Sequence, residues 1–246
     1  MGNQGRLWRS GACLSLAALS VSSPYTLAQE AAESTAVQSA RPAPANRHAA
    51  AAERRVAEAA AVVARMEAVP RMKQLLQQAK GVFIVPKYGR AALGLGVAGG
   101  AGVLLVRRQD SSWSDPAFFY LGSISVGAQA GAQGGPVAIV LNNDAALARF
   151  MQDTEFSLNA DAGLTVMNWT RYAEGRAGAG DVVVWSGTEG LFGNVAAISV
   201  NGIRYSQTAS NAYYNRMVGA QDVFAGKFSN AQADPLKRAL AKASRQ

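Results

Sequence analysis

The side chains that commonly carry enzyme chemistry are scarce in this chain of 246 residues. It has one histidine, His48, and one cysteine, Cys13. His48 lies at the edge of an alanine- and proline-rich stretch, where we expect it to be exposed to solvent. A Ser-His-Asp or Cys-His site needs a histidine within the folded domain, and zinc disfavours a site made of carboxylates alone. These residues therefore predict neither nucleophilic catalysis nor a metal site.

The remaining catalytic candidates are carboxylates near residue 155. Glu155 could act with Asp153 or Asp161 in general acid–base catalysis. The alternation of apolar and polar residues places Glu155 and Asp161 on the polar face of a predicted strand, where charges are usually solvated. We therefore expect that the protein is not an enzyme, and a carboxylate-dependent hydrolase is the alternative.

Two glycine-rich segments lie between residues 79 and 135, and the first contains a possible nucleotide-binding motif. Residues 94–99 (GLGVAG) fit the G-x-G-x-x-G pattern. That pattern requires a following helix to hold the pyrophosphate, whereas the apolar, strand-like residues 103–106 follow here. Gly226 and Lys227 lack the flanking residues of a phosphate loop. We expect no nucleotide and no other cofactor.

The glycine spacing is better explained by strands. At a period of two, the even positions of residues 92–102 are all Gly or Ala, and most odd positions are apolar. Residues 127–135 repeat the pattern, with Gln129 and Gln133 on the glycine face. So many glycines in strands indicate sharp coiling, bulges, or close approach of another backbone or a ligand. For the two glutamines, a polar binding site and a hydrogen-bond network are open alternatives.

The first 28 residues have the pattern of a secretory signal peptide. Arg6 and Arg9 precede an apolar run, residues 12–21, and small residues end at Ala28. A mitochondrial transit peptide is the alternative, because no acidic residue precedes Glu30. The signal predicts a periplasmic or secreted protein. Residues 29–46, rich in Ala, Ser and Pro, predict a disordered linker, which leaves residues 47–246 as a single domain.

The basic residues are concentrated in one region. Residues 41–90 hold ten Lys or Arg and three Glu, a net charge of +7, whereas residues 91–246 have a net charge of +1. The field of such a region attracts an anionic partner. Outside the cytoplasm, anionic lipid headgroups are more available than nucleic acid, so we expect peripheral membrane association and no nucleic-acid binding. The candidate lipid-binding cations are Arg54, Arg55, Arg65, Arg71, Lys73, Lys80, Lys87 and Arg90.

Two helices carry most of these cations. Residues 47–69 predict an amphipathic helix with Val56, Val63 and Met66 on its apolar stripe. Residues 71–80 predict a second, shorter helix. Basic amphipathic helices can lie in a membrane interface, but alanine-rich helices also pack on sheets with their charges in water. Both arrangements are open.

A series of strands follows these helices. Apolar or alternating runs predict strands, and a cap at Asn143 or Asp144 predicts a helix between two of them. Asp234 and Pro235 open a C-terminal helix. This order predicts an α+β fold, with a glycine-rich curved antiparallel sheet or small barrel flanked by N-terminal and C-terminal helices. The predicted strands are residues 81–86, 117–133, 137–141, 155–168, 181–185 and 193–200.

Several motifs together resemble the SYLF domain family. They are AKGVFIVP (79–86), the glycine-rich run ending in GVL (102–104), GAQAGAQ (127–133), NADA (159–162) and GLFG (190–193). The resemblance extends from about Val56 to Gly226. It implies a lipid-binding module, because eukaryotic relatives bind phosphoinositides through a basic, amphipathic N-terminal part. Yeast relatives also bind and bundle actin, and bacterial relatives are secreted or lipid-anchored.

The signal peptide changes the partner that the resemblance implies. Behind a bacterial-type signal we expect phosphatidylglycerol or cardiolipin in place of phosphoinositides, and no actin. A protein of the cell envelope is the alternative partner. Lys80 belongs to the family motif itself, whereas the other candidate cations rest on their charge and position.

Overall fold

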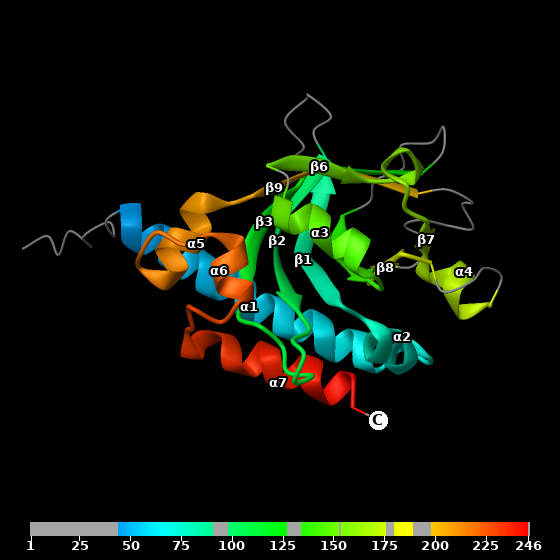
Figure 1. Ribbon diagram of the computed structural model, residues 1–246, viewed down its shortest axis with the longest axis horizontal. Helices are drawn as coiled ribbons and strands as arrows, with labels where there is room; N and C mark the ends of the chain where they lie inside the picture. Colours follow the sequence, from blue (N-terminus) through cyan, green and yellow to red (C-terminus); the bar gives the residue numbers. More distant parts are fainter. Residues whose placement is uncertain are drawn as a thin grey trace, which may run out of the picture. The chain divides into compact units, whose positions relative to one another are not determined.

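The computed structural model describes residues 44–90, 98–126, 134–152, 154–175, 180–188 and 198–245. Their centre is a curled sheet of nine strands in the order β4-β9-β3-β2-β1-β5-β8-β7, with β6 paired to β9 (Figure 1). All neighbours are antiparallel except β7 and β8, which are parallel. The strands are β1 (Gly81–Arg90), β2 (Ala98–Val106), β3 (Ala117–Leu121), β4 (Ser123–Val126), β5 (Gly135–Leu141), β6 (Glu155–Leu158), β7 (Val166–Asn168), β8 (Val182–Ser186) and β9 (Ile198–Tyr205).

Helices cover both faces of this sheet, which confirms the predicted α+β class with helices at both ends. One face is covered by α1 (Pro44–Glu67), α2 (Met72–Gln78), α5 (Gln207–Tyr214) and α7 (Asp234–Ala243) (Figure 1). The other face receives α3 (Asp144–Gln152). The remaining helices are α4 (Trp169–Ala173), α6 (Ala220–Phe224) and two short 3-10 helices, Ala160–Ala162 and Ala231–Ala233.

Helix α1 packs on the sheet through the apolar stripe that the sequence predicts. Val56, Val63 and Met66 are each at most 1% exposed. Its many alanines favour helix formation and allow close packing on β1 and β2. The helix begins three residues earlier than predicted, and Pro44 is acceptable there because the first turn needs no backbone donor.

An aromatic cluster fills the opposite, concave side of the sheet. Phe150 of α3 makes edge contacts with Phe83 on β1, Phe119 on β3 and Phe156 on β6, with ring centroids 4.8 to 5.6 Å apart. Of the two caps predicted for α3, Asn143 and Asp144, the structure has Asn143, whose Oδ1 accepts a hydrogen bond from the Ala146 amide at 2.8 Å. The cap fixes the start of the helix that delivers Phe150 to the core.

The glycines of β2 permit close approach of the neighbouring strand, as their spacing predicts. A Cβ atom at Gly100 would lie 2.8 Å from the carbonyl oxygen of Lys87, and one at Gly102 would lie 2.6 Å from the Phe83 ring. The register of β1 also shifts between Ile84 and Tyr88. Glycine is therefore required where β1 curls over β2. Most of the first glycine motif and both candidate glutamines, Gln129 and Gln133, lie outside the described residues.

The predicted long strand 117–133 is wrong, because the chain breaks at Gly122 into β3 and β4. The Gly122 amide donates to the carbonyl oxygens of Asn201 and Gly202, at 3.1 and 3.0 Å. A Cβ at this position would lie 2.9 Å from the Asn201 oxygen. The close contact with β9 bends the chain and redirects β4.

The predicted continuous strand 155–168 is also wrong. It consists of β6, a 3-10 helix and β7. The Asn159 side chain accepts a hydrogen bond from the Ala162 amide at 2.9 Å, and Gly163 has a φ of 72°. This local cap competes with strand pairing, so the strand ends at Leu158.

The last predicted strand is displaced toward the C-terminus. β9 runs over Ile198–Tyr205, whereas the prediction was residues 193–200, of which 193–197 lie outside the described residues. The short helices α4, α5 and α6 were not predicted. Helix α7 was predicted correctly, with Leu236 and Leu240 fully buried.

Candidate functional site

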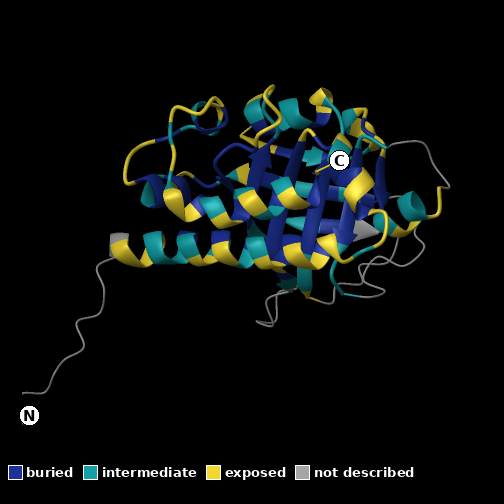
Figure 2. Ribbon diagram, turned by 90° about the horizontal axis from the view of Figure 1, so that it is seen from below, coloured by how far each residue is buried: buried dark blue, intermediate teal, exposed yellow. Residues whose placement is uncertain are grey.

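The cations of α1, α2 and α7 lie on one layer of helices that covers the sheet. Helices α1 and α7 run side by side, each with an exposed stripe (Figure 2). Lys242 of α7 forms an ion pair with Glu67 of α1 at 2.9 Å, and Gln77 next to α7 donates to the Arg245 carbonyl at 3.0 Å. We call the solvent-facing side of this layer the helical surface; besides the ion-paired Lys242, its exposed cations are Arg47, Arg54, Arg65, Lys73, Arg238 and Arg245.

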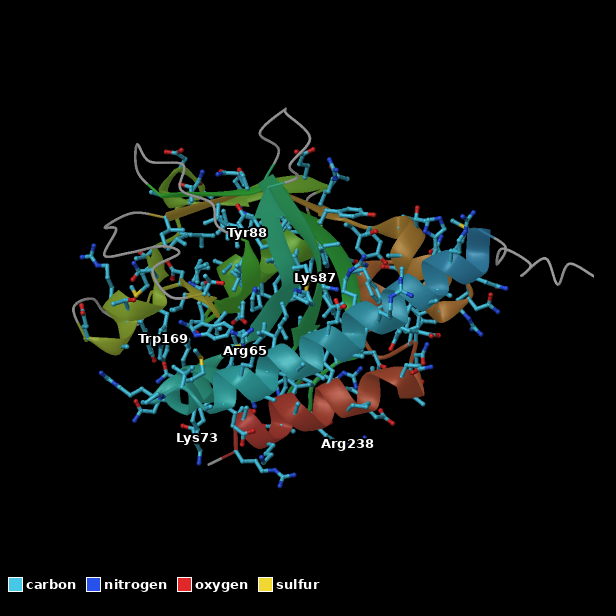
Figure 3. All side chains as sticks on the ribbon, turned by 180° about the vertical axis from the view of Figure 1, so that it is seen from behind. Arg65, Lys73, Lys87, Tyr88, Trp169 and Arg238 are labelled. Atoms are coloured by element: carbon cyan, nitrogen blue, oxygen red, sulfur yellow. The ribbon has the colours of Figure 1, made fainter. Side chains whose placement is uncertain are left out.

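Three predicted site residues belong to the helical surface. Arg54 and Arg65 are exposed on α1, eleven positions apart and therefore on one side of the helix, opposite the buried stripe. Lys73 is exposed on α2 and points away from the ribbon, as does Arg238 on α7 (Figure 3). The guanidinium of Arg65 also donates to the Gly187 carbonyl at 2.7 Å, which orients the side chain and leaves its charge intact.

Two predicted site residues form ion pairs with acids. Lys87 on β1 pairs with Glu58 on α1, and the lysine side chain is 80% exposed. Lys80, between α2 and β1, lies 3.9 Å from the carboxylate of Asp144 at the start of α3. Pairing with a carboxylate reduces the field that each lysine presents to an anionic partner.

Arg71 joins the helix layer to the far edge of the sheet. It has a φ of 67°, a conformation unusual for a non-glycine residue, at the turn between α1 and α2. Its guanidinium donates to the carbonyl of Ala173 at the end of α4. The side chain therefore fixes α4 relative to α2 while it remains exposed.

Arg55 is placed differently from the other arginines of α1. It is half-buried, and its guanidinium lies 5.9 Å from the centre of the Phe118 ring. Burial lowers the pKa of this guanidinium from its ordinary value. The position is typical of a packing contact between α1 and β3. The side chain of Arg90 lies outside the described residues.

Sequence reasoning missed three cations of the helical surface. Arg47 lies seven residues before Arg54, and this spacing places both on the same side of α1. Arg238 lies in α7 and Arg245 lies two residues after its end, 165 or more residues after Lys73, and only the tertiary structure brings this helix beside α1. The seven-residue spacing could have revealed Arg47, but no local signal links α7 to α1.

The described residues show no cluster of three or more His, Cys, Asp or Glu side chains that could hold a metal ion. Glu155 on β6 and Asp161 in the 3-10 helix are both exposed, and Asp153 lies outside the description. Of the helices described, none is both long and apolar enough to cross a membrane. The chemistry that the helical surface offers is attraction and hydrogen bonding of anions by exposed arginine and lysine.

Comparison with known proteins finds one matching family and several relatives. The model of the Ysc84 family, described as Las17-binding protein actin regulator, matches residues 122–243. An SH3 domain-containing protein of Schizosaccharomyces pombe is 29% identical over 174 residues, which cover 68% of this chain and 40% of that protein. Protein YSC84 of Saccharomyces cerevisiae is 27% identical over 174 residues, 68% of this chain and 36% of that protein.

A bovine relative extends this similarity to animals. The SH3 domain-containing YSC84-like protein 1 of Bos taurus is 27% identical over 173 residues, 68% of this chain and 49% of that protein. The chain thus spans less than half the length of these curated relatives. No solved structure shows a significant match.

Together the matches support the Ysc84, or SYLF, family for this chain. The family and its relatives carry the names of binding and regulator proteins, and none of these names is that of an enzyme.

Proposed function

We propose that this chain is a non-enzymatic SYLF-type domain that binds anionic phospholipid through the helical surface. The observation that supports it is the pairing of two of the three α1 acids. Glu58 pairs with Lys87 of β1, and Glu67 pairs with Lys242 of α7, whereas Glu53 is the third acid of the helix. The two paired acids are neutralised by cations at the flanks of α1, and the positive charge of Arg47, Arg54 and Lys73 faces solvent.

The strength of such binding depends on several cations acting together. One Lys or Arg near an anionic membrane contributes about 1 kcal/mol. Six exposed cations on adjoining helices can therefore support peripheral attachment, without any segment crossing the bilayer. Because these charges are exposed, the attachment must weaken as salt screens them.

The location and lipid class follow from the N-terminal sequence. A secretory signal in residues 1–28 supports a periplasmic or secreted, membrane-associated protein. Phosphatidylglycerol and cardiolipin are the natural ligands there. Arginine recognises their phosphate groups with paired donors, so lipids with an accessible anionic phosphate should bind better than zwitterionic lipids.

Co-sedimentation with vesicles tests the proposal. Purified protein is spun with phosphatidylglycerol, cardiolipin or phosphatidylcholine vesicles from 50 to 500 mM salt, roughly the range over which screening becomes strong. We expect binding to the two anionic lipids that declines with salt, and none to phosphatidylcholine. Equal binding to all three vesicles, or binding to none of them, contradicts the proposal.

A protein-interaction module is the second candidate. It is favoured by the description of the matching family as Las17-binding and actin-regulating. Behind a secretion signal we expect an envelope protein as partner and no actin. The polar side chains near Glu155 and Asp161 are exposed and could receive such a partner. This candidate predicts a complex that can still be crosslinked at high salt. Filamentous actin, to which we expect no binding, is the negative control.

A further inference from the structure

An open cavity lies away from the helical surface, between the end of β2, α3 and α6. Its volume is about 840 Å³, within the range of sites for small organic molecules. Its walls combine apolar side chains with polar side chains of the turn that follows β2. The lining residues are Val106, Arg107, Arg108, Gln109, Asp110, Leu147, Met151, Gln221, Phe224 and Ala225.

The two consecutive arginines in this cavity differ in their bonding. Arg107 is held by the protein: its Nε donates to the Ala79 carbonyl at 3.0 Å, its Nη2 donates to the Leu76 carbonyl at 2.8 Å, and it lies 4.5 Å from the Trp113 ring centre. Arg108 has a buried Nε with no hydrogen-bond partner in the part of the chain that the structure describes. A buried donor on a charged group is costly to leave unpaired.

The apolar part of the cavity can hold a hydrocarbon chain. Val106 and Phe224 are its buried apolar lining residues, 4% and 6% exposed, whereas Leu147 and Met151 of α3 are half-buried. Gln221 of α6 donates to the Met151 carbonyl at 2.8 Å, which braces the two helical walls. These contacts place an apolar wall beside the guanidinium of Arg108.

Arg108 interacts with the carboxylate of Asp110 through its charge, whereas the hydrogen bond to that carboxylate comes from the backbone. Asp110, at the mouth of the cavity, accepts a hydrogen bond from the Ser112 amide at 2.9 Å. Asp222 of α6 is paired with Lys227 at 2.7 Å. The guanidinium of Arg108 lies instead against the backbone at Gly226, where a Cβ would be 3.0 Å from its Nη2. The cavity therefore presents a cation next to apolar walls.

We propose that this cavity binds a single-chain amphiphile with an anionic headgroup, either carboxylate or phosphate. The headgroup accepts hydrogen bonds from Arg108, and the chain lies against Val106, Leu147 and Phe224. A charge-assisted bond to a buried guanidinium fixes the headgroup, and burial of the chain supplies most of the affinity. This site is separate from the helical surface and does not depend on the function proposed above.

Calorimetry with amphiphiles below their micelle concentrations tests the site. The probes are laurate, dodecyl phosphate, dodecyl maltoside and inorganic phosphate. We expect both anionic amphiphiles to bind, and the neutral amphiphile and free phosphate to bind at least tenfold more weakly. Arg108→Gln should weaken laurate and dodecyl phosphate about tenfold or more, because it removes a charge-assisted hydrogen bond. The matched control is Arg216→Gln, which removes an arginine that lies 5.8 Å from the Phe228 ring, outside this cavity.

A second variant keeps the proposal testable if Arg108→Gln is poorly folded. Leu147 is a half-buried residue of α3 that lines the cavity, so the larger side chain of Leu147→Trp should fill it. This variant should bind neither anionic probe. Its circular dichroism spectrum should show that it is folded. Equal binding of dodecyl maltoside, or unchanged laurate binding in either folded variant, overturns the proposal. Vesicle sedimentation separates the two sites: Arg108→Gln should sediment like the unmodified protein, whatever the calorimetry shows.

Discussion

The ammonium group of Lys87 and the carboxylate of Glu58 form an ion pair that ties β1 to α1. Lys87 was a predicted lipid contact, and here its charge is opposed by an acid of the helix that carries the helical surface. The pair also removes much of the negative field of Glu58 from the side of Arg54, which is one turn away on α1.

Glu58→Gln should therefore strengthen binding to phosphatidylglycerol vesicles. It removes a negative charge and frees Lys87, and one added cation near the membrane is worth about 1 kcal/mol, or about fivefold in affinity. Lys87→Gln is the matched control, since it leaves Glu58 unpaired and should weaken binding by a similar factor. Vesicle titration measures both, and a change in the same direction for the two variants would refute this electrostatic explanation.

Gly102→Ala should destabilise the fold strongly. The added Cβ would collide with the carbonyl oxygen of Ile84 and lie 2.6 Å from the Phe83 ring. Overpacking of this kind typically costs about 1–3 kcal/mol and more when backbone must move. Gly219→Ala is the control, because its Cβ would meet nothing nearer than the Asp222 carboxylate at 3.6 Å. Urea unfolding measures both, and an equal free energy of unfolding for the two variants would show that β2 tolerates a side chain.

Phe150→Ala should remove the centre of the concave aromatic cluster. The side chain is 2% exposed and contacts three other phenylalanine rings. Truncation of such a residue typically costs about 3–5 kcal/mol. Met217→Ala, at an 82% exposed position, should change the free energy of unfolding by less than about 0.5 kcal/mol. A small effect of Phe150→Ala in thermal unfolding would contradict the role of α3 in the core.

Tyr213 and Tyr214, adjacent on α5, should respond in opposite ways to replacement by phenylalanine. The Tyr213 hydroxyl is buried without a hydrogen-bond partner among the residues that the structure describes, whereas the Tyr214 hydroxyl donates to the Pro116 carbonyl at 2.8 Å. Tyr213→Phe should be neutral or stabilising, and Tyr214→Phe should cost about 1 kcal/mol. Urea unfolding at neutral pH measures this difference, and a larger loss for Tyr213→Phe would contradict the assigned bonding.

The same two tyrosines predict instability in alkali. Burial raises the pKa of both phenols above the ordinary value of 10.0. The folded state thus holds protons that the unfolded state loses, so their contribution to stability is present below about pH 10 and falls as the pH rises further. Unfolding between pH 8 and 12 should show this decline, and the decline should be shallower in Tyr213→Phe. A flat profile would contradict the burial of these phenols.

Local patterns were sufficient for the elements whose apolar residues repeat without interruption. The stripe of Val56, Val63 and Met66 predicted α1, and the glycines at 100 and 102 predicted close strand approach, because both signals lie within one element. The breaks at Gly122 and after Leu158 were missed because they depend on contacts with Asn201 and on the Asn159 cap. Apolar alternation continues across both breaks and conceals them.

The helical surface was predictable only in part for the same reason. Charge density selected α1 and α2, and exposure on the folded domain then separates Arg54 and Lys73 from the half-buried Arg55. Arg238 and Arg245 could not be predicted as neighbours, because their place beside α1 results from tertiary packing of α7. The buried Nε of Arg108, which has no hydrogen-bond partner within the described part of the chain, is likewise a property of the folded protein.

The central claim, that the helical surface rather than the total charge binds lipid, is tested most directly by two triple variants of equal net charge. One neutralises the helical surface with Arg47→Gln, Arg54→Gln and Lys73→Gln. The other neutralises exposed cations elsewhere with Arg204→Gln, Arg216→Gln and Lys227→Gln. Binding to phosphatidylglycerol vesicles should fall at least tenfold in the first, since three cations contribute about 3 kcal/mol, and less than about threefold in the second. Equal losses in the two variants would contradict the claim.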